Sequence, residues 1–158
     1  MVYLISGKKN EGKTAKLKDI AAKLTNPRGF IAEKVQDCGR VTTYTLTDLR
    51  TGEQCTMARL ASLPLPEDWG EDFHHGPFRF SLKAFEWSRR LLDEALEEKA
   101  ACFVIDEVGK IELEGGGHAD VVRRALTSDM DLYISVRDIN LNAVVEAFSI
   151  GEHQVITI

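Results

Sequence analysis

The sequence has no apolar run long enough to cross a bilayer, and the apolar stretch near its start, residues 2–5, ends at Ser6. A membrane-spanning helix needs about 20 mostly apolar residues, and a signal peptide needs an apolar segment of about 7–15. Cysteine is also scarce. The three cysteines, Cys38, Cys55 and Cys102, are odd in number and have no C-x-x-C spacing. Such a set favours reduced thiols over disulfides or a zinc site. We therefore expect a cytoplasmic protein without a membrane partner.

A basic surface of the kind that binds nucleic acid is missing as well. The 158 residues include 20 Lys and Arg against 25 Asp and Glu, which gives a formal net charge of -5, and no basic stripe is visible. Because nucleic-acid backbones are bound by clustered Lys and Arg, we do not expect nucleic acid as the main partner. The length fits a single domain over residues 1–158, and 44% hydrophobic residues suffice to build its core.

The sequence does contain a full match to the pattern G-x-x-x-x-G-K-[ST], at residues 7–14 and directly after the apolar run. A β-prone run leads in and a segment of helical periodicity follows, as a phosphate-binding loop requires. In such a loop, backbone N–H groups and the positive end of the next helix hold the phosphates. Lys13 is expected to reach the β and γ phosphates, and Thr14 to ligate Mg²⁺. The candidate nucleotide-binding residues are Gly7, Lys8, Lys9, Asn10, Glu11, Gly12, Lys13, Thr14 and Ala15.

One position of this loop is unusual. Many phosphate-binding loops carry a third glycine where this chain has Asn10, at a position that can require positive φ. Asparagine adopts positive φ more readily than other non-glycine residues, so the loop is predicted to form, with less conformational freedom. Lys8 and Lys9 add positive charge that can attract phosphates, although we expect at least one of them to be simply solvated.

Beyond the loop, the apolar spacing alternates between helical and strand periods. The β-rich segments 30–36, 40–46 and 54–57 predict an inserted antiparallel hairpin segment over about residues 29–57. The acidic, Pro-containing stretch at about 64–77 is predicted to be a loop that exposes Trp69 and Phe73. The other predicted elements are helices over about 14–24, 82–98, 118–126 and 140–148 and strands over about 101–105, 132–136 and 154–158. This alternation indicates an α/β fold with a mostly parallel sheet flanked by helices.

The apolar run at residues 101–105 is typical of a strand buried in a parallel sheet, and it ends in Asp106 and Glu107. An enzyme with a phosphate-binding loop needs a second strand that brings a carboxylate to the Mg²⁺ ion. Asp106 is therefore predicted to hold Mg²⁺, directly or through water. Glu107 is predicted to orient or deprotonate the attacking water. The structural alternative is a strand-end cap followed by a solvated glutamate.

Residues 106–109 also satisfy D-x-x-G, a pattern of GTPase switches, but the sequence has no N-K-x-D or T-K-x-D with which to specify guanine. A cation is expected to stabilise charge in the transition state. Arg137 follows a predicted strand and is the first candidate, with Arg79 and Lys110 as alternatives. The predicted catalytic residues are Lys13, Glu107 and Arg137, and the predicted metal ligands are Thr14 and Asp106.

The segment Val104 to Leu113 resembles the D-E-I-G-K-M-E-L signature of the small nucleoside-triphosphatases first recognised in hyperthermophiles, a family with a human cancer-related member. Further matches lie in the hairpin at Glu33, after it at Arg59, and in the long helix at Glu86. The resemblance implies a P-loop NTPase domain with a RecA-like core and an added antiparallel segment. It also implies slow hydrolysis of ATP, GTP and other nucleoside triphosphates to diphosphates, with little base preference. Lys110 and Glu112 match the signature without an assigned role.

Some residues depart from the family pattern. Lys9, Asn10 and Ala15 replace a proline, a glycine and a second threonine of the family's loop. The glycine run at residues 115–117 and the following His118 are atypical as well.

Other functions stay open at this point. The loop is also similar to that of the GTP-binding accessory protein of molybdopterin-guanine dinucleotide synthesis, although nothing after the loop supports that relative. A nucleotide-binding accessory or switch module that acts through a partner is one alternative to the hydrolase, and a small-molecule kinase is another. For the hydrolase we expect a monomer that uses Mg²⁺ and a nucleoside triphosphate.

Overall fold

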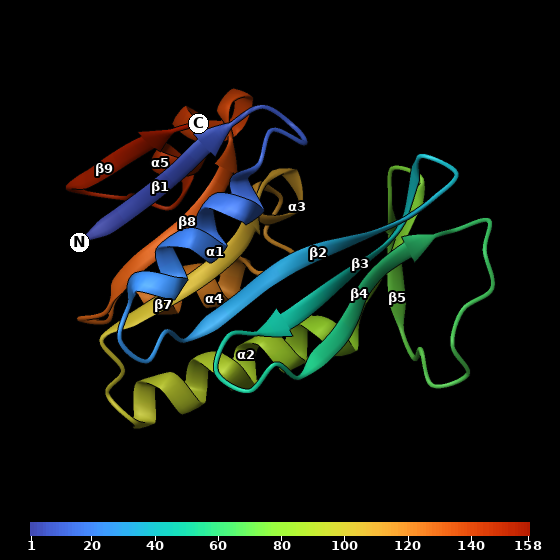
Figure 1. The fold of residues 1–158 in the computed structure, drawn as a ribbon, viewed down its shortest axis with the longest axis horizontal. Helices are drawn as coiled ribbons and strands as arrows, with labels where there is room; N and C mark the ends of the chain where they lie inside the picture. Colours follow the sequence, from blue (N-terminus) through green and yellow to red (C-terminus); the bar gives the residue numbers. More distant parts are fainter.

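Strand β2 joins two differently built halves of one sheet in the computed structural model, which describes residues 1–158 (Figure 1). The nine strands lie in the order β5-β6-β4-β3-β2-β7-β8-β1-β9. From β2 to β9 all neighbours are parallel, and from β2 to β5 all neighbours are antiparallel. The strands are β1 (Val2–Gly7), β2 (Gly29–Asp37), β3 (Arg40–Asp48), β4 (Gln54–Leu60), β5 (Asp72–His75), β6 (Phe78–Ser81), β7 (Cys102–Val108), β8 (Asp131–Arg137) and β9 (His153–Thr157). This is the predicted α/β fold, with a parallel core and an added antiparallel segment.

The helices are α1 (Lys13–Lys23), α2 (Leu82–Glu97), α3 (Lys110–Leu113), α4 (Ala119–Leu126) and α5 (Leu141–Ala147), with a 3-10 turn at Asp138–Asn140. Helix α1 covers one face of the parallel strands, where Leu17 packs with Ile5, Ile31 and Val104. Helices α2, α4 and α5 cover the opposite face and form the larger core (Figure 1). The strands between the two helix layers are therefore buried on both faces, which explains their continuous apolar sequences. No helix of the chain combines the length and the apolar composition needed to cross a bilayer.

The antiparallel half, which we call the wing, consists of β3, β4, β5, β6 and the outer part of β2. Strand β2 pairs with β7 only through Gly29 and Phe30, whereas it pairs with β3 from Phe30 to its end at Asp37. Gly29 has φ of 104°, and a Cβ atom there would lie 2.1 Å from the Val104 carbonyl oxygen. Only glycine fits this approach. The wing consequently extends away from the core on the side of the sheet opposite β9 (Figure 1).

The predicted acidic loop over about residues 64–77 is wrong in its second half, because residues 72–75 form β5 and pair with β6. The predicted exposure of Trp69 is also wrong, since this side chain is only 7% exposed. Its Nε1 donates to Asp72 at 2.8 Å, and Phe73 is half-buried and stacks on Phe80 at 5.4 Å between ring centroids. Four-residue strands bounded by proline and glycine give too short an alternation to be recognised from sequence. Trp69 and Phe73 therefore stabilise the wing and do not form an open aromatic surface.

Candidate active site

The predicted phosphate-binding loop connects the end of β1 to the first turn of α1. Asn10 has φ of 62° and Gly12 has φ of 94°, so both lie in the left-handed region. The positive φ expected at Asn10 is confirmed. Its Oδ1 also accepts a hydrogen bond from Lys34 of β2. The amide of Lys16 donates to the Gly12 carbonyl at 2.9 Å, which starts α1 directly after the loop. The positive end of an 11-residue helix thus faces the loop.

Lys13 is buried and its ammonium group lies against the loop itself. Its Nζ donates to the Lys8 carbonyl at 2.8 Å and to the Gly7 carbonyl at 3.4 Å. These contacts satisfy the buried charge within the loop. A phosphate oxygen is a stronger partner for this ammonium group because it carries negative charge. Lys13 is therefore positioned to exchange loop carbonyls for a bound phosphate.

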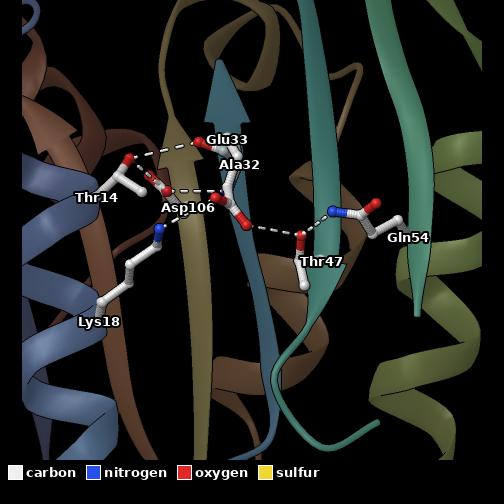
Figure 2. A network of polar contacts seen from close by, with 7 residues as sticks. All are labelled: Thr14, Lys18, Ala32, Glu33, Thr47, Gln54 and Asp106. Carbon is white, nitrogen blue, oxygen red and sulfur yellow. Dashed lines mark hydrogen bonds and ion pairs between the residues drawn. The ribbon is translucent and has the colours of Figure 1, made fainter. Parts of the chain in front are cut away.

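Asp106 lies at the carboxyl end of β7 and is 1% exposed. Its Oδ1 accepts a hydrogen bond from the Ser135 hydroxyl of β8 at 2.6 Å. Its Oδ2 accepts from the Thr14 hydroxyl at 2.7 Å and from the Ala32 amide of β2 at 3.0 Å (Figure 2). Burial raises the pKa of Asp106, while these three donors and the Lys13 charge act in the opposite direction. One carboxylate thus joins β2, β7, β8 and the first turn of α1.

Oxygen atoms suited to a divalent cation meet at this junction. The Thr14 hydroxyl and the Asp106 carboxylate are in direct contact, and both are of the hard oxygen type that Mg²⁺ prefers. The chain has no group of three or more His, Cys, Asp or Glu side chains that could hold a metal ion. A Mg²⁺ ion here would therefore depend on phosphate oxygens or water for its other ligands, as is usual for this ion.

Glu107 is half-buried and lines the same cleft as Lys13, Asp106 and Arg137. Burial raises the pKa of Glu107; the Lys13 charge lowers it, Asp106 raises it further, and the Arg137 charge lowers it. A carboxylate with raised pKa takes up a proton more readily than an exposed one. Glu107 therefore has the electrostatic surroundings that a general base for water requires.

The structure distinguishes among the three candidates for the cation that stabilises transition-state charge, which are Arg137, Lys110 and Arg79. Arg137, at the end of β8, lines the cleft, and its Nε is buried without a hydrogen-bond partner. Lys110 also lines the cleft but is exposed at the start of α3. Arg79 does not line it, because its Nε is paired with Asp72 of β5 at 2.6 Å. An orphaned buried donor beside Glu107 makes Arg137 the better candidate for binding an anionic group.

We expect Arg137→Ala to lower the turnover number by roughly 10²-fold, the usual cost of removing one donor that stabilises transition-state charge. Arg79→Ala is the matched control and should leave turnover unchanged, because Arg79 is held by Asp72 in the wing. Steady-state phosphate release measures both variants. Equal turnover of Arg137→Ala and the wild-type protein would remove Arg137 from the site.

Glu112 and His118 line the cleft, although neither was assigned a role from the sequence. Glu112 is buried, and its carboxylate accepts from the amides of Gly109 and His118, each at 2.9 Å. It thus ties the turn after β7 to the start of α4. Its match to the family signature was the one available signal, since the partners are backbone groups that no side-chain pattern reveals.

The buried Glu112 predicts a pH-dependent stability. Burial raises its pKa from 4.5 to about 7, despite the opposing hydrogen bonds from backbone amides. The folded state therefore binds this proton more tightly than the unfolded state, and the resulting stabilisation is lost as the pH rises through about 7. Between pH 5 and pH 8 the wild-type free energy of unfolding should fall by on the order of 3 kcal/mol relative to Glu112→Gln.

Chemical denaturation at several pH values measures this difference. The exposed Glu114, two positions away, supplies the control variant Glu114→Gln, whose pH profile should run parallel to that of the wild type. A parallel profile for Glu112→Gln as well would show that Glu112 is not the titrating group.

Most of the predicted residues come together in one cleft of about 690 Å³, but Gly7, Lys8, Glu11 and Ala15 do not line it. It is lined by Lys9, Asn10, Gly12, Lys13 and Thr14 of the loop region and by Asp106, Glu107 and Arg137 at the strand ends. The same cleft continues to the wing, where Tyr44, Phe78 and Phe80 line it together with Phe85 of α2. Phosphate-binding, metal-binding and proton-accepting groups thus surround a single space.

Comparisons with known proteins agree with this arrangement. A family model described as NTPase matches residues 2–158. Nucleoside-triphosphatase THEP1 of Thermotoga petrophila is 30% identical over 138 residues, which cover 87% of this chain and 72% of the relative. The protein of the same name from Thermotoga maritima is 29% identical over 138 residues, with 87% and 74% covered.

Two solved structures are similar in fold. The crystal structure of THEP1 from the hyperthermophile Aquifex aeolicus has a TM-score of 0.76 at 20% identity, covering 99% of this chain and 89% of that one. The solution structure of a human cancer-related nucleoside triphosphatase has a TM-score of 0.69 at 21% identity, covering 99% and 87%. Both similarities include the wing as well as the parallel core.

Proposed function

The chain belongs to the NTPase family, and on that premise we propose that it hydrolyses nucleoside triphosphates, ATP and GTP among them, to diphosphate and phosphate with the help of Mg²⁺. The observation that carries this proposal is the 2.7 Å contact between Thr14 and Asp106. It brings the end of the phosphate-binding loop to the carboxylate strand, with Glu107 directly after that carboxylate. Hydrolysis needs these parts at one point.

Each residue has a distinct part in the proposed reaction. The loop amides and Lys13 bind the phosphates, and Thr14 and Asp106 are the residues that would hold Mg²⁺. When bound, this ion neutralises charge on the phosphate oxygens. Glu107 accepts the proton of the attacking water, and Arg137 donates to the oxygens on which negative charge develops. Burial of these groups strengthens their electrostatic effect on the transferred phosphoryl group.

Broad base tolerance and slow turnover are part of the same proposal. Tolerance is supported by the absence of N-K-x-D and T-K-x-D, which leaves guanine without its usual recognition motif. Slow turnover is supported by the resemblance to the small nucleoside-triphosphatases.

A phosphate-release panel over ATP, GTP, CTP and UTP, with and without Mg²⁺, tests the proposal, with Lys13→Ala as the blank. We expect Mg²⁺-dependent release from all four nucleotides by the wild type and none above background by the variant. Release from only one nucleotide would contradict base tolerance, and release without Mg²⁺ would contradict the metal requirement. A kinase would instead transfer the γ-phosphoryl group to a small acceptor, so the right acceptor would suppress phosphate release in favour of a phosphorylated product. A switch would bind nucleotide without turnover.

A further inference from the structure

Strand β2 brings a lysine of the wing to the phosphate-binding loop. Lys34 lies in the outer part of β2, where it pairs with Tyr44 of β3 and no longer with β7. Its ammonium group donates to Oδ1 of Asn10, and both residues line the cleft. Lys34 therefore connects the wing to the loop at the point where the loop meets the cleft.

Lys34 is held there only by a neutral group. Two other lysines of the cleft have firmer partners, since Lys13 donates to two loop carbonyls and Lys18 is paired with Glu33 at 3.0 Å. Lys34 forms no salt bridge, and its partner is the amide oxygen of Asn10. A charged oxygen is a stronger partner for an ammonium group than a neutral one. Because its side chain is exposed, Lys34 can exchange Asn10 for a phosphate oxygen.

The strand order places Lys34 on the opposite side of Glu107 from Arg137. Strand β7 carries Asp106 and Glu107 and lies between β2 and β8, and Arg137 ends β8. Partial burial lowers the pKa of Lys34, the Glu107 charge raises it and the Lys13 charge lowers it, so both groups lie within its electrostatic range. A phosphoryl group bound by Lys13 and facing Glu107 would therefore have one cation on each side.

We propose that Lys34 is a further catalytic residue, which leaves Asn10 when a nucleoside triphosphate binds and donates to the γ-phosphate from the side of the wing. The identity of this ligand rests on the proposed function. A nucleoside diphosphate has no γ-phosphate and leaves Lys34 on Asn10. Lys34 thereby favours the substrate over the diphosphate product, and its charge stabilises the oxygens of the transferred phosphoryl group in the transition state.

Binding of Mg²⁺ with ADP and with the non-hydrolysable triphosphate AMP-PNP tests this inference, measured by calorimetry so that turnover plays no part. We expect Lys34→Met to bind AMP-PNP roughly tenfold more weakly than the wild type and ADP equally well, the cost of one charged hydrogen bond. Lys34→Arg keeps the charge and should retain most of the preference for the triphosphate. Lys18→Met removes the same charge from the cleft, but it should leave the ratio of the two affinities unchanged because Lys18 is paired with Glu33.

Asn10→Gly separates a contact with the phosphate from an effect on the loop. Glycine readily adopts the φ of 62° found at Asn10, so the loop keeps its shape while Lys34 loses its partner. If Lys34 binds the γ-phosphate, Asn10→Gly keeps the preference for AMP-PNP, and adding Lys34→Met removes it. If Lys34 acts only by holding Asn10, either single variant weakens ADP and AMP-PNP binding alike. That second result would overturn the inference.

The turnover number supplies an independent readout. Lys34→Met should lower kcat roughly tenfold, a smaller effect than that of Arg137→Ala because the Lys34 side chain is exposed. An unchanged affinity ratio in Lys34→Met would overturn the inference, and an unchanged kcat would remove its catalytic part. If the wild type releases no phosphate but Lys34→Met still weakens AMP-PNP binding, the proposed function fails and the contact with the γ-phosphate stands.

Discussion

Glu107→Gln is expected to bind nucleotide as tightly as the wild type and to turn over roughly 10²- to 10⁴-fold more slowly. The substitution preserves the size of the side chain but removes its ability to accept a proton from water. Glu107 lies outside the phosphate-binding loop. The loop and Lys13 should therefore keep their contacts with the nucleotide in this variant. Binding of a fluorescent nucleotide and single-turnover phosphate release measure the two properties separately.

Glu33 supplies the matched control for this prediction. It also lines the cleft, but Lys18 donates to its carboxylate at 3.0 Å and Thr47 donates at 3.0 Å (Figure 2). The Lys18 hydrogen bond is the main cause of its lowered pKa, which makes Glu33 a poor proton acceptor. Glu33→Gln should therefore keep most of its turnover. Full activity of Glu107→Gln would exclude Glu107 as the base.

Asp106→Asn should lower Mg²⁺-dependent turnover by roughly 10³-fold, which corresponds to the loss of several kcal/mol of metal-derived stabilisation. The amide oxygen can still accept from Thr14 and from the Ala32 amide, and the Ser135 hydroxyl can rotate to accept from the new amide group. The fold should therefore persist while the metal loses its charged ligand. Turnover measured against Mg²⁺ concentration, together with thermal unfolding, checks both expectations.

Ser135→Ala separates the charge of Asp106 from its hydrogen bonding. This variant removes the 2.6 Å hydrogen bond to Oδ1 but leaves the carboxylate in place. Its effect on turnover should be roughly tenfold or less, the cost of one hydrogen bond. If Asp106→Asn and Ser135→Ala reduced turnover equally, Asp106 would have a structural role and not a metal-binding one.

Much of this site could be predicted because its main parts are short segments with recognisable sequence patterns. The loop at residues 7–14 and the strand that ends at Asp106 are each continuous in sequence, and parallel strands bring their carboxyl ends to one edge. Positive φ at Asn10 followed from side-chain chemistry at a single position. These inferences needed no knowledge of distant contacts.

The parts that could not be predicted depend on such contacts. Trp69 looked exposed because its neighbours are acidic, yet Asp72 accepts its N–H and the side chain is buried. Arg79 remained an alternative to Arg137 until Asp72 was found beside it. In the aromatic part of the cleft, Tyr44 of β3 contacts Phe78 of β6, although the two residues are far apart in the chain. No local periodicity encodes these neighbours.

Hydrolysis of ATP in ¹⁸O-labelled water tests the central claim most directly. If Glu107 activates water at the loop's γ-phosphate position, each phosphate released in a single turnover carries one ¹⁸O atom from the solvent. Lys13→Ala should release none. Absence of labelled phosphate, with the γ-phosphoryl group recovered on another molecule or left on intact ATP, would contradict the account.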